Sequence, residues 1–383
     1  MNEPHDLYVM DISYFSGKME AYLRYKEIPF RRHEPSWRAI SGFIHANTVL
    51  MKVPVVRTPE GPWLQDTTPM IDWFETRHPE GAVIPADPYQ AFFSRLLEDY
   101  ADEWLWRPAL HYRWSYALDR EMLTNRFLNE FLRTMPGPRA FKRWSVQRRQ
   151  RRVYVEGDGV SPETRPHVEG VYLRNLDWLQ RCFERRPFLL GDRPSLADFG
   201  YFASMFRHFS LDPTPARIMR ERAPAVYEWV ARLWNARRSR TRGDWVPAES
   251  IPEEWSPILR DIGEAYLPYL HANADAWRRG ARRLDFHVQG VTYRALPVVQ
   301  YRVWCRERLQ DHFDALPSPA RARVEKTLGA HGCLEPLGRD GRIESHLHDG
   351  AAPPVCRPRR VGKIERLRLL YAGTDWNAPK EKR

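Results

Sequence analysis

Three hydroxyl side chains, Ser13, Tyr14 and Ser16, stand in a short loop around the start of the first predicted helix. A helix N-terminus offers unpaired backbone amides and the positive end of the helix dipole, so a hydroxyl there can help to hold an anion such as a thiolate. Lowering a thiol pKa by about two units requires about 2.7 kcal/mol. The dipole supplies ~0.3–1 kcal/mol, or up to ~2 when partly buried, and one hydrogen bond to a charged group supplies about 1.5–3 kcal/mol. The two sources together suffice, although either serine could instead be an ordinary helix N-cap.

Two further short motifs could bind a ligand. Lys52-Val53-Pro54 opens a predicted strand, and Asp66-Thr67 precedes a predicted helix. A helix start is a natural site for a carboxylate, and Asp66 could meet an ammonium group. The alternatives are an N-cap role for Asp66 and Thr67, a trans proline on a strand edge and a solvated Lys52.

A third group of residues is aromatic. Trp104, Trp106, His111, Tyr112 and Trp114 lie close together in a helical segment, and aromatic clefts suit apolar ligands. Each of them could equally lie in the core or at a dimer contact. The sequence predicts no metal site and no disulfide scaffold, because the four cysteines are far apart and lack metal-ligand spacing. They are Cys182, Cys305, Cys333 and Cys356.

The elements that position these groups begin with a mixed segment. Residues 5–79 predict a strand–helix–strand unit followed by a hairpin and a helix, and residues 80–88 form a linker rich in proline and glycine. Residues 89–240 show helical periodicity only. Within them, Ser195 and Asp198 predict a capping box at the start of a helix.

The last part, residues 241–383, predicts helix and strand together. Ile258–Trp277 and Trp304–Leu316 have helical periodicity. The alternation of Leu284–Tyr301 predicts a small hairpin, and the tail from Ala351 is rich in proline and arginine and predicted to be irregular.

Composition limits the class of protein. A chain of 383 residues, 43% of them hydrophobic, can bury the cores of two or three domains and is not disordered. The N-terminus has no signal-peptide pattern and no apolar run could span a membrane, so we expect a cytoplasmic protein with no membrane partner. The net charge is +11, and the densest basic cluster lies within residues 139–152. No RNA-binding sheet motif accompanies it, so the sequence does not favour a nucleic-acid partner.

Four of these features, in this order and spacing, resemble the glutathione S-transferase superfamily. They are Ser13–Lys18, Lys52–Val55, Leu64–Thr67 and Leu189–Asp198. The resemblance covers roughly residues 5–240. It implies a thioredoxin-like α/β domain followed by an all-α glutathione-transferase-type domain and, from the family, a homodimer. Residues 241–383 would then form a mixed α+β extension of unknown role.

The resemblance also implies a site for glutathione as co-substrate. Ser13 stands where family members carry a catalytic serine or cysteine, and Ser16 stands at the second cysteine of the thioredoxin C-x-x-C pattern. Tyr14 is an alternative hydroxyl donor. No cysteine precedes Cys182, so we do not expect dithiol or mixed-disulfide chemistry at this site.

The other motifs would bind the rest of glutathione. Pro54 resembles the cis-proline of the family, which turns the backbone of the preceding residue, here Val53, toward the cysteinyl amide. Asp66 and Thr67 resemble the pair that holds the γ-glutamyl end, with Asp in place of the usual Glu and Thr in place of Ser. Lys52 could reach the glycyl carboxylate.

We expect Trp104, His111 and Tyr112 to line a pocket for a hydrophobic electrophile. Two functions follow from the resemblance. In the first, the protein is a glutathione transferase-like enzyme whose bound thiolate attacks a small hydrophobic substrate. In the second, it is a non-catalytic binding or scaffold protein that keeps the fold while its C-terminal region engages a partner.

Overall fold

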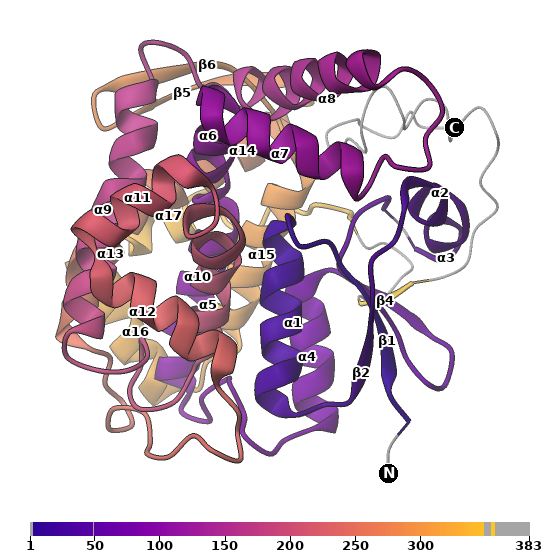
Figure 1. The fold of residues 1–383 in the computed structure, drawn as a ribbon. Helices are drawn as coiled ribbons and strands as arrows, with labels where there is room; N and C mark the ends of the chain where they lie inside the picture. The colour runs from indigo at the N-terminus through magenta and orange to yellow at the C-terminus, as the bar shows by residue number, and fades with distance from the viewer. Residues whose placement is uncertain (1–2, 49, 348–353, 357–383) are drawn as a thin grey trace.

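The computed structural model describes residues 3–48, 50–347 and 354–356 (Figure 1). Its main sheet has the strand order β2-β1-β3-β4-β7, so the last of the described strands lies at an edge of the N-terminal sheet. β1 and β2 are parallel, and the other neighbours are antiparallel. The strands are β1 (His5–Tyr8), β2 (Phe30–His33), β3 (Val55–Arg57), β4 (Trp63–Gln65) and β7 (Val355–Cys356).

Alternation along the strands gives this sheet two apolar faces. Leu7, Val56 and Leu64 are in register and fully buried in the core shared with two helices that lie side by side in Figure 1. Val55, the next residue along β3, packs on the opposite face with Ile44 of a short helical segment. The helices are α1 (Tyr14–Lys26) and α4 (Thr67–Arg77) on the first face, with α2 (Trp37–Ala39), a π-helical turn (Ile40–Ile44) and α3 (His45–Asn47) on the second.

The middle of the chain is helical, as predicted. Gly200 brings two of its helices close together, because a Cβ there would lie 2.6 Å from the Cα of Glu98. The predicted capping box of Ser195 and Asp198 is confirmed at the start of α10. The helices are α5 (Pro88–Glu103), α6 (Trp106–Ser115), α7 (Ala117–Asn129), α8 (Arg139–Tyr154), α9 (Arg165–Phe183), α10 (Leu196–Ser204), α11 (Pro213–Arg222) and α12 (Pro224–Asn235).

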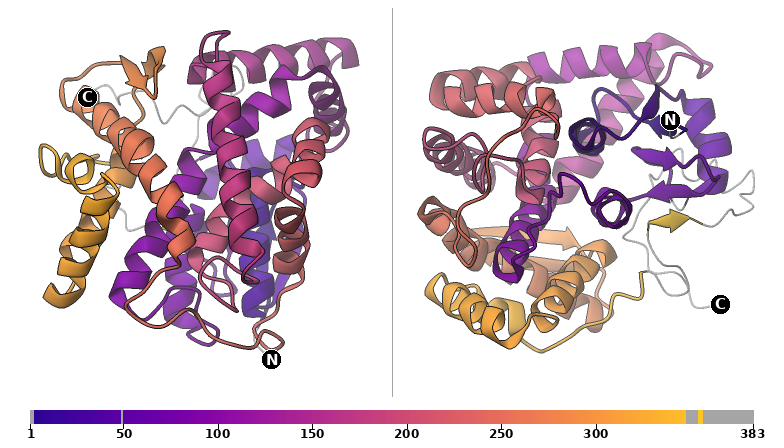
Figure 2. Two further views of the ribbon diagram at one scale, coloured as in Figure 1. Left: turned by 90° about the vertical axis from the view of Figure 1, so that its left-hand side faces the viewer. Right: turned by 90° about the horizontal axis from the view of Figure 1, so that it is seen from below.

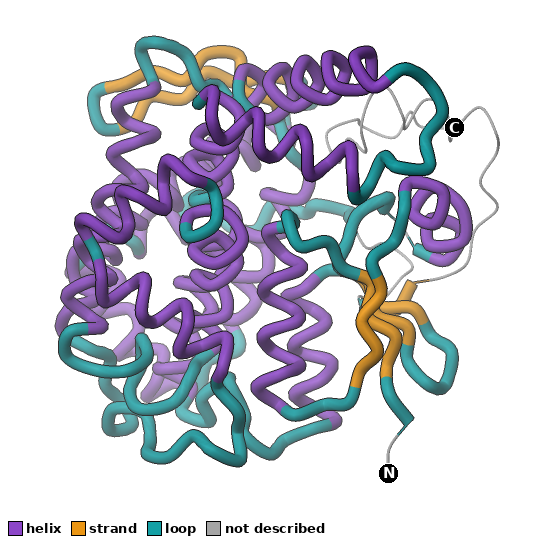
Figure 3. The backbone as a smooth tube through the Cα atoms, in the orientation of Figure 1, coloured by secondary structure: helices purple, strands orange, loops and turns teal. Residues whose placement is uncertain are grey.

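The C-terminal extension forms a layer along the helical part of the molecule, orange to yellow in Figure 2. Its two-stranded hairpin, separate from the main sheet in Figure 3, confirms the prediction for this segment. The sequence did not predict that the chain would return to pair β7 with β4. The elements are α13 (Ser256–Asp261), α14 (Leu267–Arg278), β5 (Arg283–Val288), β6 (Val291–Pro297), α15 (Gln300–Asp314), α16 (Ser318–Ala330) and α17 (Leu334–Gly338).

Polar contacts hold the extension on α5. The hydroxyl of Tyr266 donates to the Asp99 carboxylate over 2.6 Å, and the hydroxyl of Tyr100 donates to Asp261 over 2.9 Å. All four groups lie in the interface, so the extension and the helical part share one core. The predicted domain boundaries stay predictions. Among the described helices, none is both long and apolar enough to cross a membrane.

Candidate functional site

Strand register brings three of the predicted motifs to one end of the sheet. Tyr8, Val55 and Gln65 are direct neighbours across β1, β3 and β4. The loop to Ser13 leaves β1 beyond Tyr8, Pro54 comes just before Val55, and Asp66 follows Gln65. Helices α1 and α4 therefore both begin at this end of the sheet. Two helix N-termini side by side favour an anionic ligand.

Ser13 is the N-cap of α1. Its side chain accepts a hydrogen bond from the amide of Ser16 over 3.4 Å, and it is half-buried. Within the described chain the Ser13 hydroxyl donates to no acceptor, so its proton remains available to a ligand. Ser16 is fully buried, and its oxygen accepts from the amide of Met10 over 3.3 Å. Ser16 thus fixes the loop, whereas Ser13 stands at its more open side.

The hydroxyl of Tyr14 already has a hydrogen-bond partner within the protein. Its hydroxyl donates to the backbone carbonyl of Ala101 over 2.6 Å, and only 2% of the residue is exposed. Its ring packs against Trp106 and His208. Burial raises the pKa of Tyr14 well above its ordinary value. The prediction of Tyr14 as an alternative donor is wrong, because its proton already bonds a backbone oxygen between α1 and α5.

The peptide bond between Val53 and Pro54 is cis, as expected from the resemblance. Val53 is half-buried, whereas Lys52 is exposed. Gln65 shapes this segment, since its amide nitrogen donates to the carbonyls of Leu50 and Lys52 over 2.9 and 3.1 Å. The backbone that precedes Pro54 is therefore tied to the end of β4.

Asp66 has an unusual backbone at the start of α4. Its φ of 81° lies in a region that non-glycine residues rarely adopt, and such residues concentrate at ligand-binding positions. Its side chain does not cap the helix. Within the described residues, the backbone amides of Thr67 and Thr68 have no acceptor. A carboxylate next to two free amides can bind the ammonium and carboxylate of an amino acid together.

Tyr301 of α15 contacts this carboxylate. Its hydroxyl lies 3.2 and 3.1 Å from the two carboxylate oxygens of Asp66. Burial raises the pKa of Asp66 to about 7, although the Tyr301 hydrogen bond and the positive charge of Lys18 act in the opposite direction. No sequence pattern pointed to this contact, because Tyr301 is 235 positions from Asp66 and ended a predicted hairpin.

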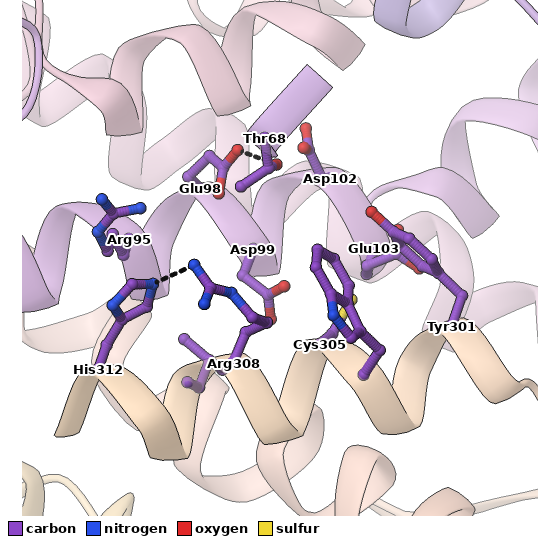
Figure 4. A pocket seen from close by; sticks show the side chains of 12 residues that line it. Thr68, Arg95, Glu98, Asp99, Asp102, Glu103, Tyr301, Cys305, Arg308 and His312 are labelled. Carbon is purple, nitrogen blue, oxygen red and sulfur yellow. Dashed lines mark hydrogen bonds between the residues drawn. The ribbon is translucent and has the colours of Figure 1, made fainter. Parts of the chain in front are cut away.

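A small cavity lies between α5 and α15 and is lined in part by Tyr301, the residue that contacts Asp66 (Figure 4). Its volume of about 30 Å³ has room for water but is far below the ~300–1,000 Å³ of ordinary ligand pockets. Lys18 is fully buried near it, 2.5 Å from Glu98 and also paired with Asp102. The cavity lining is Thr68, Arg95, Glu98, Asp99, Asp102, Glu103, Tyr301, Trp304, Cys305, Arg308, Leu309 and His312.

The predicted electrophile pocket is wrong. Trp104 packs against Tyr269 of the extension with ring centroids 5.5 Å apart, and 2% of it is exposed. Tyr112 is also 2% exposed and packs against Tyr172. His111 is fully buried and bonded to a glutamate on α9. Trp104 directly follows α5, whereas His111 and Tyr112 lie on α6, and packing against other helices buries all three.

The site carries no metal-binding arrangement in the part of the chain that is described. No group of three or more His, Cys, Asp or Glu side chains there could hold a metal ion. All four cysteines are buried. Burial raises the pKa of the Cys182 and Cys333 thiols, so neither is a ready nucleophile.

Two family models match the chain. The model of the glutathione S-transferase N-terminal domain matches residues 7–82, and that of the C-terminal domain matches residues 162–232. The structure combines a mixed α/β sheet domain with an all-helical domain, in the order that these models have. Both matched segments are glutathione S-transferase domains, and the whole of the C-terminal extension lies outside both matches.

Solved structures of the superfamily are similar at low identity. A glutathione S-transferase from Rhodospirillum rubrum F11 is 18% identical, with a TM-score of 0.40, covering 66% of this chain and 97% of that one. One from Methylobacterium radiotolerans, in complex with glutathione sulfonate, is 20% identical, with a TM-score of 0.38 and coverages of 64% and 100%. The beta-etherase LigF from Sphingobium sp. strain SYK-6 is 20% identical, with a TM-score of 0.43 and coverages of 60% and 95%. At these scores the assignment rests on the family models. No curated protein matches the sequence.

Proposed function

We propose that the protein binds glutathione at the end of the sheet and activates its thiol for attack on a hydrophobic electrophile. One observation carries the proposal. The strand register places the Ser13 loop, Pro54 and Asp66 at the same end, where two helices begin. The match to both glutathione S-transferase domains supports glutathione as the ligand.

Each part of glutathione has a matching group. The γ-glutamyl ammonium would meet Asp66, and its carboxylate would accept from the free amides of Thr67 and Thr68. The backbone of Val53 would pair with the cysteinyl amide. Exposed Lys52 would reach the glycyl carboxylate.

The thiol would release its proton to solvent, and the Ser13 hydroxyl would donate a hydrogen bond to the resulting thiolate sulfur. That hydrogen bond and the N-terminus of α1 both favour the thiolate over the thiol. The thiolate forms a bond between sulfur and the electrophilic carbon of the second substrate, and the leaving group departs with the electron pair. Ser13 acts by stabilising charge and does not itself form a covalent bond.

The second candidate is a non-catalytic glutathione-binding protein. It is supported by the burial of Trp104, His111 and Tyr112, which removes the apolar pocket that we expected. The contact of Tyr301 with Asp66 points the same way, since the extension already occupies part of the γ-glutamyl position. The homodimer and the cytoplasmic location stay predictions, the first of which light scattering would test.

Calorimetric titration of the full chain with glutathione tests binding. The ultraviolet absorbance of the bound thiolate against pH then tests activation. We expect Ser13→Ala to raise the pKa of the bound thiol by about one to two units, because one hydrogen bond to a charged group is lost. Ser318→Ala, an exposed serine at the start of α16, should leave it unchanged.

Absence of binding would refute the proposal. Binding with an unshifted thiol pKa, and no turnover of activated aryl halides, would leave the second candidate. An unchanged thiol pKa in Ser13→Ala would remove Ser13 from its assigned role while keeping the site.

A further inference from the structure

Helix α8 carries an unusual outward face. Between Phe131 and Val155 the sequence holds eight Lys or Arg residues and no Asp or Glu. The helix runs along the upper edge of the molecule in Figure 1, outside α7. At 100° per residue, five exposed side chains fall within one third of its circumference. This aromatic–arginine stripe consists of Phe141, Trp144, Arg148, Arg151 and Arg152.

The two aromatic residues of the stripe are more than half exposed. Phe141 is 54% and Trp144 is 55% exposed, among the most exposed large apolar side chains of the described chain. Their ring centroids are 5.9 Å apart. The guanidinium of Arg148 lies 5.5 Å from the Trp144 ring. Leaving two large aromatic rings exposed is unfavourable, because their apolar area stays in water. Such exposed apolar patches often mark an interaction surface.

The arginines of the stripe lack counter-charges. In the described chain, neither Arg148 nor Arg152 has a carboxylate within ion-pair distance, and Arg151 reaches Glu156 only at 3.9 Å. The basic residues on the inner side of α8 differ. Arg143 pairs with Glu121, and Lys142 donates to backbone carbonyls of the preceding turn.

We propose that the aromatic–arginine stripe of α8 docks the protein on an anionic phospholipid surface. Guanidinium groups bind lipid phosphates through paired hydrogen bonds. Trp side chains prefer the depth of the lipid headgroups, where the ring is buried and its N–H stays hydrated, and Phe side chains insert from the apolar face of interfacial helices. The stripe presents both kinds of group on one exposed face of α8, which can lie along a bilayer surface.

Other anionic or apolar partners fit the stripe less well. Single-stranded nucleic acid uses a groove with open ring faces for base stacking, whereas Phe141 and Arg148 crowd Trp144. A second copy of the chain would bring like charges together, since each copy has a net charge of +11. Charge complementarity therefore favours the lipid surface.

Flotation of the full chain with vesicles tests the proposal. We expect binding to vesicles of equal parts phosphatidylcholine and phosphatidylglycerol, weakening with salt, and none to phosphatidylcholine alone. Each arginine near an anionic surface contributes about fivefold, so Arg148→Gln, Arg151→Gln and Arg152→Gln together should lower the partition coefficient about 100-fold.

The matched control removes the same charge elsewhere. Arg217→Gln, Arg220→Gln and Arg240→Gln also lower the net charge by three at exposed positions and should change the partition coefficient less than fivefold. Equal losses from the two triple variants would overturn the proposal, because net charge alone would then explain the binding. Absence of vesicle binding by the wild type would overturn it as well.

Two further measurements separate the alternatives. Trp144→Ala should lower vesicle binding about tenfold even at high salt, while Tyr227→Ala, another exposed aromatic, should not. Unchanged vesicle binding by the Trp144→Ala variant would contradict insertion of the Trp144 ring into the lipid. Tighter binding of a single-stranded oligonucleotide than of vesicles, lost in the stripe variant, would assign the stripe to nucleic acid instead.

Discussion

Asp66 is a carboxylate that we expect to lower the stability of the folded protein at neutral pH. Burial raises its pKa to about 7 from an ordinary 3.8. Because the pKa of Asp66 is higher in the folded state than in the unfolded state, the contribution of Asp66 to stability is greatest below pH ~4. That contribution falls as the pH rises to ~7. A pKa difference of about three units corresponds to about 4 kcal/mol in the free energy of unfolding. Since Asp66 is only half-buried, solvent screening reduces this to about 2 kcal/mol.

Asp66→Asn removes the charge and keeps an oxygen that can accept from Tyr301. At pH 8 the free energy of unfolding should rise by about 2 kcal/mol, a gain of about 2–3 °C in melting temperature for a chain of this length. At about pH 3, below the unfolded-state pKa of 3.8, Asp66 is neutral in both the folded and the unfolded state, so the two proteins should melt alike. The assay is thermal denaturation followed by circular dichroism at the two pH values, together with glutathione titration, in which the variant should lose ammonium binding.

Asp72→Asn is the matched control on the same helix. Asp72 bonds Arg95 over 2.7 Å, so its neutralisation removes a favourable contact and should not stabilise the protein. Refutation would be an Asp66→Asn variant that melts at or below the wild-type temperature at pH 8 while matching it at about pH 3. Stabilisation without loss of glutathione binding would refute only the ligand role of Asp66.

Three further predictions concern single residues. Tyr301→Phe removes a hydrogen bond to the Asp66 carboxylate, so the pH midpoint of glutathione binding should move upward by about one unit. Titration with glutathione at several pH values measures the midpoint. An unchanged midpoint would contradict the effect of Tyr301 on the pKa of Asp66. Asp198→Ala leaves several buried donors unpaired and should lower unfolding free energy by about 3–5 kcal/mol in urea denaturation, more than Asp198→Asn does. Gly200→Ala should lower it by about 1–3 kcal/mol by pushing α10 off Glu98, and a neutral result would show that the helices can separate.

Local patterns in the sequence predicted most of the fold that positions the site. The short, mostly buried run from Asp6 to Asp11 predicted the first strand, and Ser195 with Asp198 predicted the start of α10 through a motif whose partners are three residues apart. Pro54 was expected to be cis from its place in a four-part pattern, and it is. Each of these signals is contained in a few neighbouring residues, or in the order of such groups.

The failures have a common physical origin in contacts between distant segments. Trp104 looked like a pocket residue, but the extension covers it with Tyr269. Tyr14 looked like a donor, but Ala101 lies opposite its hydroxyl. A side chain's helical face can be deduced from periodicity, whereas the identity of what covers that face depends on tertiary packing.

The position of Tyr301 links the extension to the candidate site by thermodynamics. Its hydroxyl bonds a carboxylate that the proposed ligand would also use. If ligand binding changes the strength of that bond, then docking of α15 must change ligand affinity by the same factor, since coupling between two equilibria is reciprocal. A ligand that strengthens the charge on Asp66 would tighten α15 on α4, and one that replaces the hydroxyl would loosen it. Because the same helix packs on α5, either change passes directly to the helical part of the molecule.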